Sequence, residues 1–144
     1  MFQRILLAVD GSEASLAAAR VAGRLAGQLG VGVRVLTVFD QPNSELGEPN
    51  YSNALSEELR DADQALNVAV GAVREAGGPE PEIDRIAGRP ADVILEVASG
   101  EREPLIIMGN RGRGRIASAL LGSVSTAVVS RAAGPVLVVP DPSH

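Results

Sequence analysis

The chain has 144 residues and a net charge of −5, which suits a single domain over 1–144 that buries roughly 70% of its unfolded surface, and which disfavours a nucleic-acid partner. It has no cysteine, its only histidine is His144 and all 13 basic residues are arginines, so cysteine nucleophiles, histidine-built zinc sites, an internal histidine base and lysine chemistry are excluded. No apolar run reaches the roughly 18 residues of a membrane span, and the N-terminus lacks a signal-peptide core, so we expect a cytoplasmic protein that does not act at a membrane.

Apolar runs alternate with helical patterns along the first half of the chain. Residues 4–9 form a near-continuous apolar run, which predicts a strand covered on both faces. Asp10 or Ser12 can cap the helix that follows. Further elements are predicted at 13–29 (helix), 33–39 (strand), 52–76 (helix) and 82–87 (edge strand), with a long polar connection at 40–51. The stripe of the second helix is Leu55, Leu59, Ala62, Leu66, Ala69 and Val73.

The second half continues the alternation. It predicts a third helix from 88–90 to a C-cap at Gly100, a strand at 105–108, a helix at 123–132 and a strand at 136–139. The resulting order, βαβαβαβαβ, predicts an α/β fold with a five-stranded, parallel, doubly wound sheet and helices on both faces. Ligands of such sheets bind beyond the carboxyl ends of the strands, where the strand order reverses.

A glycine-rich segment with three arginines follows the strand at 105–108. Gly109, Gly112 and Gly122 leave backbone N–H groups open to approach, and the helix that starts at Ser123 adds a partial positive charge. This combination suits a polyanion such as the phosphate chain of a nucleotide. The alternatives are a plain turn and solvated side chains for Arg111, Arg113 and Arg115. The match of 112–117 to a dinucleotide fingerprint is interpreted as accidental, because it follows the penultimate strand rather than the first, and because the next acidic residue is Asp141, near the chain end.

Other candidate residues also have two interpretations. Asp10 is either a helix cap or part of the wall at the base or ribose end of a pocket, and Ser123 and Ser125 either start the helix or face phosphates. Met108 is expected in the core, at the pocket floor. The acidic residues at 57, 58, 61 and 63 are expected on a solvated helix face.

Three segments resemble the universal stress protein family, in particular its ATP-binding branch. Residues 5–12 are similar to the opening strand and turn of that family, 88–94 to its third crossover and 133–140 to its last strand. The spacing Gly109-x2-Gly112-x9-Gly122-Ser123 matches the signature of the ATP-binding branch. The resemblance covers nearly the whole chain. It implies a flavodoxin- or Rossmann-like sheet with strand order 3-2-1-4-5.

The resemblance also implies a site for ATP, with Mg²⁺ or Mn²⁺ bound through the phosphates. By this resemblance, Ala8, Val9, Asp10 and Val38 contact adenine and ribose, and Met108 flanks the base. Ribose and phosphates would be held by Gly109, Arg111, Gly112, Gly122, Ser123, Val124 and Ser125. No residue is assigned to catalysis or to direct metal binding.

Two classes of function follow from this site. The first is a regulatory nucleotide-binding module in a stress response, whose partner surface responds to ATP occupancy. The second is a slow ATPase or an autophosphorylating enzyme, in which Asp10 assists a metal or water. A flavin or cyclic-nucleotide binder on the same fold is a further alternative. A homodimer is expected because residues 136–139 would otherwise leave an apolar edge strand bare, and because this strand pairs across a two-fold axis in the resembled family.

Overall fold

The computed structural model describes residues 2–110 and 122–142. In chain order, the elements are β1 (Arg4–Val9), α1 (Glu13–Leu29), β2 (Gly32–Phe39), the 3₁₀ turn η1 (Ser44–Leu46), α2 (Asn50–Glu75), β3 (Glu82–Ala87), α3 (Pro90–Ser99), β4 (Pro104–Gly109), α4 (Ser123–Arg131) and β5 (Val136–Val139). All the predicted strands and helices are present, with ends displaced by no more than one or two residues.

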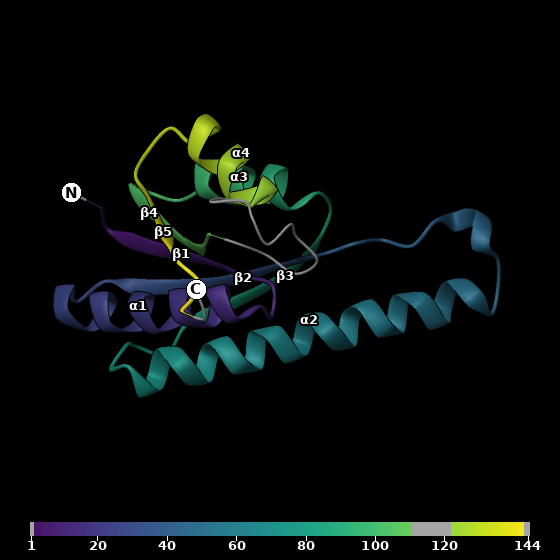
Figure 1. Cartoon of the computed structure of the whole chain (residues 1–144), viewed down its shortest axis with the longest axis horizontal. Coiled ribbons are helices and arrows are strands. Elements are labelled where there is room, and N and C mark those ends of the chain that lie inside the picture. Colours follow the sequence, from purple (N-terminus) through teal and green to yellow (C-terminus); the bar gives the residue numbers. More distant parts are fainter. Residues whose placement is uncertain (1, 111–121, 143–144) are drawn as a thin grey trace.

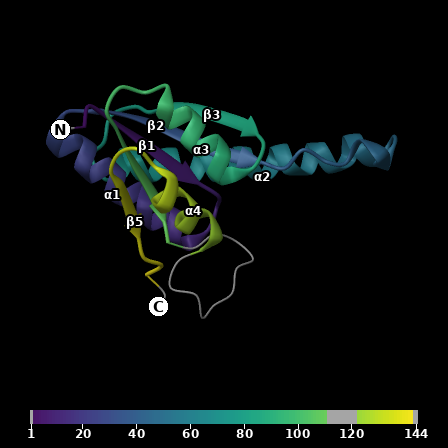
Figure 2. The ribbon, with the colours of Figure 1, turned by 90° about the horizontal axis from the view of Figure 1, so that it is seen from above.

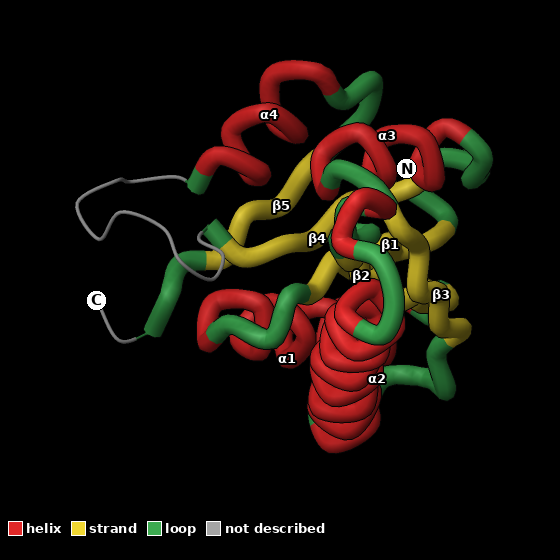
Figure 3. The backbone as a smooth tube through the Cα atoms, turned by 90° about the vertical axis from the view of Figure 1, so that its right-hand side faces the viewer, coloured by secondary structure: helices red, strands yellow, loops and turns green. Residues whose placement is uncertain are grey.

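The five strands form one parallel sheet in the order β3-β2-β1-β4-β5. Helices α1 and α2 cover one face of the sheet, and α3 and α4 cover the other (Figures 1 and 3). The predicted fold class and strand order are therefore confirmed. The chain builds outward from β1 to β3, then crosses back to β4, so the strand order reverses between β1 and β4.

Each sheet face carries its own apolar core. In β1, Ile5 and Leu7 point to the α1–α2 face, whereas Leu6 and Ala8 belong to the cluster on the α3–α4 face. All of these except Ala8 are completely buried. The near-continuous apolar run at 4–9 is thus explained by a central strand whose successive side chains enter two different cores.

Helices α1 and α2 pack closely because small residues line their contact. The buried face of α1 consists mostly of alanine, with Gly23 at the crossing. A Cβ atom on Gly23 would lie 2.5 Å from the carbonyl oxygen of Val73 in α2. The two backbones therefore touch, and a larger side chain at this point would force the helices apart.

Helix α2 extends beyond the sheet at its N-terminal end. Figures 1 and 2 show this part of α2 projecting from the body of the molecule, with the connection from β2 running alongside it. The predicted stripe is buried from Ala62 onward, whereas Leu55 and Leu59 are only partly covered. The sequence pattern was correct for the helix but did not show where the sheet beneath it ends.

Charged side chains join the strands at the amino end of the sheet. Arg4 Nη2 and Arg34 Nη2 lie 2.7 and 3.0 Å from Glu82 Oε2, and Arg34 Nη1 lies 2.7 Å from Asp84 Oδ2. Glu101, in the turn before β4, lies 2.9 Å from Arg34 Nε and 3.5 Å from Arg4 Nε. This amino-end ion-pair cluster (Arg4, Arg34, Glu82, Asp84 and Glu101) links β1, β2 and β3 to the segment that leads into β4.

Within the described ranges, no helix has both the length and the apolar composition that crossing a membrane requires.

Candidate functional site

A cavity of about 370 Å³ lies at the carboxyl end of the sheet, where the strand order reverses. The register places Ala8 of β1 beside Met108 of β4, so the last residues of both central strands reach the same edge. Of the predicted site residues, all ten that the structure describes line this cavity: Ala8, Val9, Asp10, Val38, Met108, Gly109, Gly122, Ser123, Val124 and Ser125. The other two, Arg111 and Gly112, lie outside the described residues.

The turn after β1 forms one wall of the cavity and is held by a chain of hydrogen bonds. Asp10 Oδ1 accepts from the Ser12 N–H at 2.9 Å, and Ser12 Oγ accepts from the Ser15 N–H at 3.1 Å. Ser15 Oγ accepts from the Asp10 N–H at 3.3 Å and donates to the Ser12 carbonyl at 3.1 Å. Ser12 is therefore the N-cap of α1, while Asp10 shapes the turn before it.

Gly109 closes the cavity at the end of β4, for a reason that the sequence did not indicate. A Cβ atom at this position would lie 2.7 Å from both the carbonyl carbon and the Cβ of Ala14. The first turn of α1 thus packs directly on the β4 backbone. Gly109 lines the cavity, but the absence of a side chain there is required by packing within the protein.

The start of α4 forms the opposite wall. Gly122 is the N-cap, with φ −72° and ψ 166°, and makes no side-chain cap to the first N–H groups of the helix. These dihedral angles are open to any residue, so glycine is not needed there for its backbone conformation. Ser123 is exposed, whereas the Ser125 hydroxyl is buried and lies 3.1 Å from each of the Asn110 and Gly122 carbonyl oxygens. Ser125 therefore braces the wall through its side chain.

Seven further residues line the cavity that the sequence interpretation missed: Ser15, Leu36, Phe39, Asp40, Glu58, Pro90 and Ile94. Glu58 corrects a prediction, because the solvated face of α2 was expected to hold it. It reaches the cavity because α2 continues past the carboxyl edge of the sheet. Leu36 and Ile94 belong to the buried cluster on the α3–α4 face, so one side of the cavity is apolar.

The described lining is acidic. Asp10, Asp40 and Glu58 contribute carboxylates, and no described lining residue carries a positive charge. No group of three or more His, Asp or Glu side chains among the described residues is arranged to hold a metal ion. Attraction for an anion must therefore come from backbone N–H groups at the start of α4, or from residues outside the described ranges.

The sequence and the fold both have close counterparts among known proteins. The sequence profile of the universal stress protein family matches residues 1–140. The chain belongs to the universal stress protein family. A universal stress protein of Thermus aquaticus is 40% identical over 139 residues, which cover 96% of this chain and 99% of that protein.

Solved universal stress proteins share the architecture. The universal stress protein UspA from Lactobacillus plantarum superposes with a TM-score of 0.85 and 26% identity, and the match covers 96% of this chain and 97% of that one. Another universal stress protein, crystallised in complex with cAMP, gives a TM-score of 0.78 at 29% identity and covers 97% and 98% of the two chains. A nucleotide is thus bound by a structural relative of this universal stress protein.

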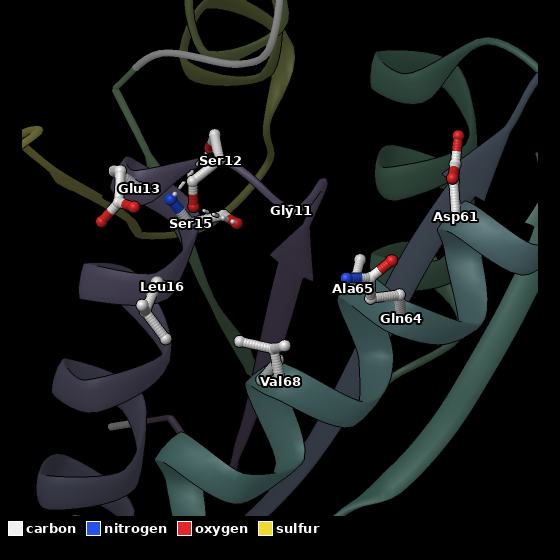
Figure 4. A pocket seen from close by; sticks show the side chains of 10 residues that line it. Gly11, Ser12, Glu13, Ser15, Leu16, Asp61, Gln64, Ala65 and Val68 are labelled. Atoms are coloured by element: carbon white, nitrogen blue, oxygen red, sulfur yellow. Dashed lines mark hydrogen bonds between the residues drawn. The ribbon is translucent and has the colours of Figure 1, made fainter.

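Two other cavities have less favourable linings for a nucleotide. A groove of about 270 Å³ between α1 and α2 shares Ser15 with the candidate site, but it carries Glu13 on one side and Asp61 on the other (Figure 4). A cavity of about 720 Å³ lies at the amino end of the sheet, between the ends of α3 and α4 and the starts of β4 and β5. Among these three cavities, the candidate site alone lies at the carboxyl ends of the central strands and beside a helix start that has no side-chain cap.

Proposed function

We propose that this universal stress protein binds ATP in the carboxyl-end cavity and acts as a regulatory module whose partner surface responds to nucleotide occupancy. The observation that carries the proposal is that the ten described residues which the family resemblance implies for the site all line one cavity at the reversal of strand order. The cAMP complex of a structural relative supports a nucleotide as the ligand class. The cavity volume also lies within the range of about 300–1,000 Å³ usual for small-molecule sites.

The lining divides into parts that match the parts of a nucleotide. Ala8, Val38 and Met108, with Leu36 and Ile94 behind them, offer an apolar surface for a base. The backbone from Ser123 to Ser125 offers N–H groups for phosphate, and the motif adds Arg111 and Gly112, which lie outside the described residues. Mg²⁺ or Mn²⁺ would enter with the phosphates, because the described residues provide no metal site of their own.

The sharpest test replaces Gly122 with aspartate. In its present conformation Gly122 is well placed as an N-cap, so an aspartate there would satisfy the first N–H groups of α4 from within the protein and repel phosphate. We expect thermal stability to be kept or slightly raised while ATP binding is lost. The loss of two charge-assisted hydrogen bonds, at about 1.5–3 kcal/mol each, would weaken binding by at least a hundredfold. Calorimetric titration with ATP and thermal unfolding measure the two effects.

Gly122→Ser and Gly122→Ala are matched controls for this test. Serine caps the N–H groups without charge, and alanine adds only a methyl group, so affinity should decrease in the order Gly, Ala, Ser, Asp. Wild-type protein should bind ATP more tightly than adenosine, with a gap that shrinks in high salt. Equal affinity for ATP and adenosine, or a folded Gly122→Asp variant with wild-type ATP affinity, would overturn phosphate binding at α4. Competition between ATP and cAMP then decides which nucleotide is preferred.

A regulatory role is favoured over efficient catalysis because Asp10, the candidate base, is already engaged in a hydrogen bond. Asp10 already accepts a hydrogen bond from Ser12 in the turn, and the sequence has neither lysine nor an internal histidine. We expect any ATP hydrolysis or autophosphorylation to be far slower than the usual enzyme range of about 1–10³ per second. Turnover within that range, abolished by Asp10→Asn, would instead favour the enzyme.

We further propose that the protein is a homodimer through β5. This strand ends the sheet, and Leu137 in it remains 38% exposed. A second copy paired along the same edge would satisfy the outer backbone groups of β5 and cover this side chain. Light scattering should give about twice the chain mass of 14.8 kDa, and a monomer at micromolar concentration would contradict the proposal.

A further inference from the structure

Hydrogen bonds from three parts of the fold meet at Asn110, the residue directly after β4. Its N–H donates to the Val139 carbonyl at the end of β5 at 2.7 Å, and its Oδ1 accepts from the Asp141 N–H at 3.0 Å. Its carbonyl oxygen accepts from the Gly122 N–H at 2.5 Å and from Ser125 Oγ at 3.1 Å. One residue therefore connects the end of β4, the start of α4 and the chain that leaves β5.

The backbone and the side chain of Asn110 serve different partners. Its peptide groups hold the start of α4 and the last residue of β5, and any residue except proline at position 110 would keep these groups. The side-chain oxygen accepts from the Asp141 N–H, and a residue without an acceptor there would remove this bond. Asn110 was not among the predicted site residues, and it does not line the cavity itself.

We propose that Asn110 is a positioning residue of the nucleotide site and couples that site to the chain leaving β5. This inference rests on the proposed function. A ligand at the first turn of α4 would lie beside Gly122 and Ser125, which are both hydrogen-bonded to the Asn110 carbonyl. The carbonyl, the N–H and the side chain of Asn110 are all attached to one Cα atom, so a displacement of this residue at its carbonyl would also move the groups that hold Val139 and Asp141. The β5 edge is thus the surface that would register nucleotide occupancy.

Thermodynamic linkage makes the coupling measurable from either side. If nucleotide strengthens the Asn110–Asp141 bond, then removing that bond must weaken nucleotide binding by the same factor. A neutral hydrogen bond contributes about 0.5–1.5 kcal/mol, so the expected loss of affinity is about twofold to tenfold.

The experiment compares wild type with Asn110→Ala and Asn110→Asp. ATP affinity is measured by calorimetry, and exchange of the Asp141 amide hydrogen by NMR, with and without ATP. In wild type we expect the Asp141 amide to be protected and ATP to raise that protection. Asn110→Ala should lose the protection and bind ATP about twofold to tenfold more weakly. Asn110→Asp keeps the acceptor oxygen, so it should keep the protection, and any affinity loss due to its added charge should disappear in high salt.

The same bond can be removed from its donor side. Asp141→Pro eliminates the N–H in the C-terminal segment and leaves Asn110 intact. Asp141→Ala keeps the N–H, so the difference in ATP affinity between these two variants isolates the hydrogen bond even if Asn110→Ala fails to fold. Asn67→Ala, on an exposed position of α2, is the matched control and should bind ATP like wild type.

The outcomes separate this inference from the proposed function. If wild-type protein binds no nucleotide, both fall. If wild type binds ATP but Asp141→Pro and Asp141→Ala bind it equally, and ATP leaves the Asp141 exchange unchanged, only the coupling is overturned. If Asp141→Pro binds ATP more weakly than Asp141→Ala, and ATP raises the protection of the Asp141 amide in wild type, the coupling is supported.

Discussion

The two ends of the sheet are stabilised in different ways. At the amino end, side chains of opposite charge pair across the strands, and Glu101 faces both Arg4 and Arg34. At the carboxyl end, the connections run through backbone groups and short polar side chains, as in the turn at Asp10 and the junction at Asn110. Carboxylates line the cavity there, and none of the described lining residues is basic.

The difference indicates which end is available for binding. The charges of the amino end are largely neutralised by one another, so that end contributes mainly to stability. The carboxyl end holds its backbone in place with hydrogen bonds to backbone groups and short polar side chains, and it leaves the first N–H groups of α4 without a side-chain cap. Substitutions at the amino end should therefore alter stability alone, and most substitutions in the cavity should alter binding.

Gly109 lies in the cavity, but we expect its substitution to reduce stability, and this loss should be the largest of the effects predicted here. It lines the cavity, yet a Cβ atom there would lie 2.7 Å from the Ala14 carbonyl carbon. We expect Gly109→Ala to lower the free energy of unfolding by about 2–3 kcal/mol, because the rigid backbone of α1 must move. Urea unfolding measures the loss. Gly134→Ala is the control, since its nearest neighbour would be a carbonyl oxygen 3.7 Å away. Equal stability of the two variants would show that α1 adjusts freely.

Glu101→Gln tests the amino-end ion-pair cluster. The Glu101 side chain is only 14% exposed and faces two guanidinium groups. Its neutralisation should lower the free energy of unfolding by about 1–3 kcal/mol, while ATP affinity stays at the wild-type value. Glu80→Gln, in the exposed pair with Arg74, should leave stability almost unchanged. A change in ATP affinity in Glu101→Gln would mean that the two ends of the sheet are coupled.

The fold was largely predictable because each element has a local signature. Apolar runs mark the strands, and residues such as Ser12 and Gly100 mark helix ends. The ten described site residues came from the resemblance to the universal stress protein family, and the convergence of the carboxyl ends of parallel strands explains why they lie around one cavity. Long-range placement was not predictable. Glu58 depends on how far α2 passes the sheet, Asn110 on the meeting of α4 with β5, and Gly109 on the approach of Ala14.

Acid should weaken the amino end through Glu82. The hydrogen bond from Arg4, and then the charge of Arg4, hold the pKa of this carboxyl below its ordinary value of 4.5. Since the folded pKa is the lower one, the stabilisation is complete above the unfolded pKa and is lost as pH falls through the folded pKa. We expect the melting temperature to fall below about pH 4.5, and to fall less steeply in Glu82→Gln. Identical acid profiles for the two proteins would show that the pair contributes nothing.

The smallest expected effect concerns the acidic residues of the cavity. Asp40 lines it just after β2 and Glu58 lines it from α2, and no described residue of the lining carries a positive charge that would balance theirs near a phosphate-bearing ligand. These carboxylates repel the phosphate charge of ATP, and solvent weakens the repulsion because the groups are partly exposed. Asp40→Asn and Glu58→Gln should therefore each tighten ATP binding by about twofold to fivefold at low salt. The gain should vanish at high salt and should be absent for adenosine, which carries no phosphate. Glu57→Gln, on the exposed face of α2, is the matched control. Weaker ATP binding in Glu58→Gln would mean that this carboxylate accepts a hydrogen bond from the ligand, and the acidic lining would then contribute to recognition of the base or ribose.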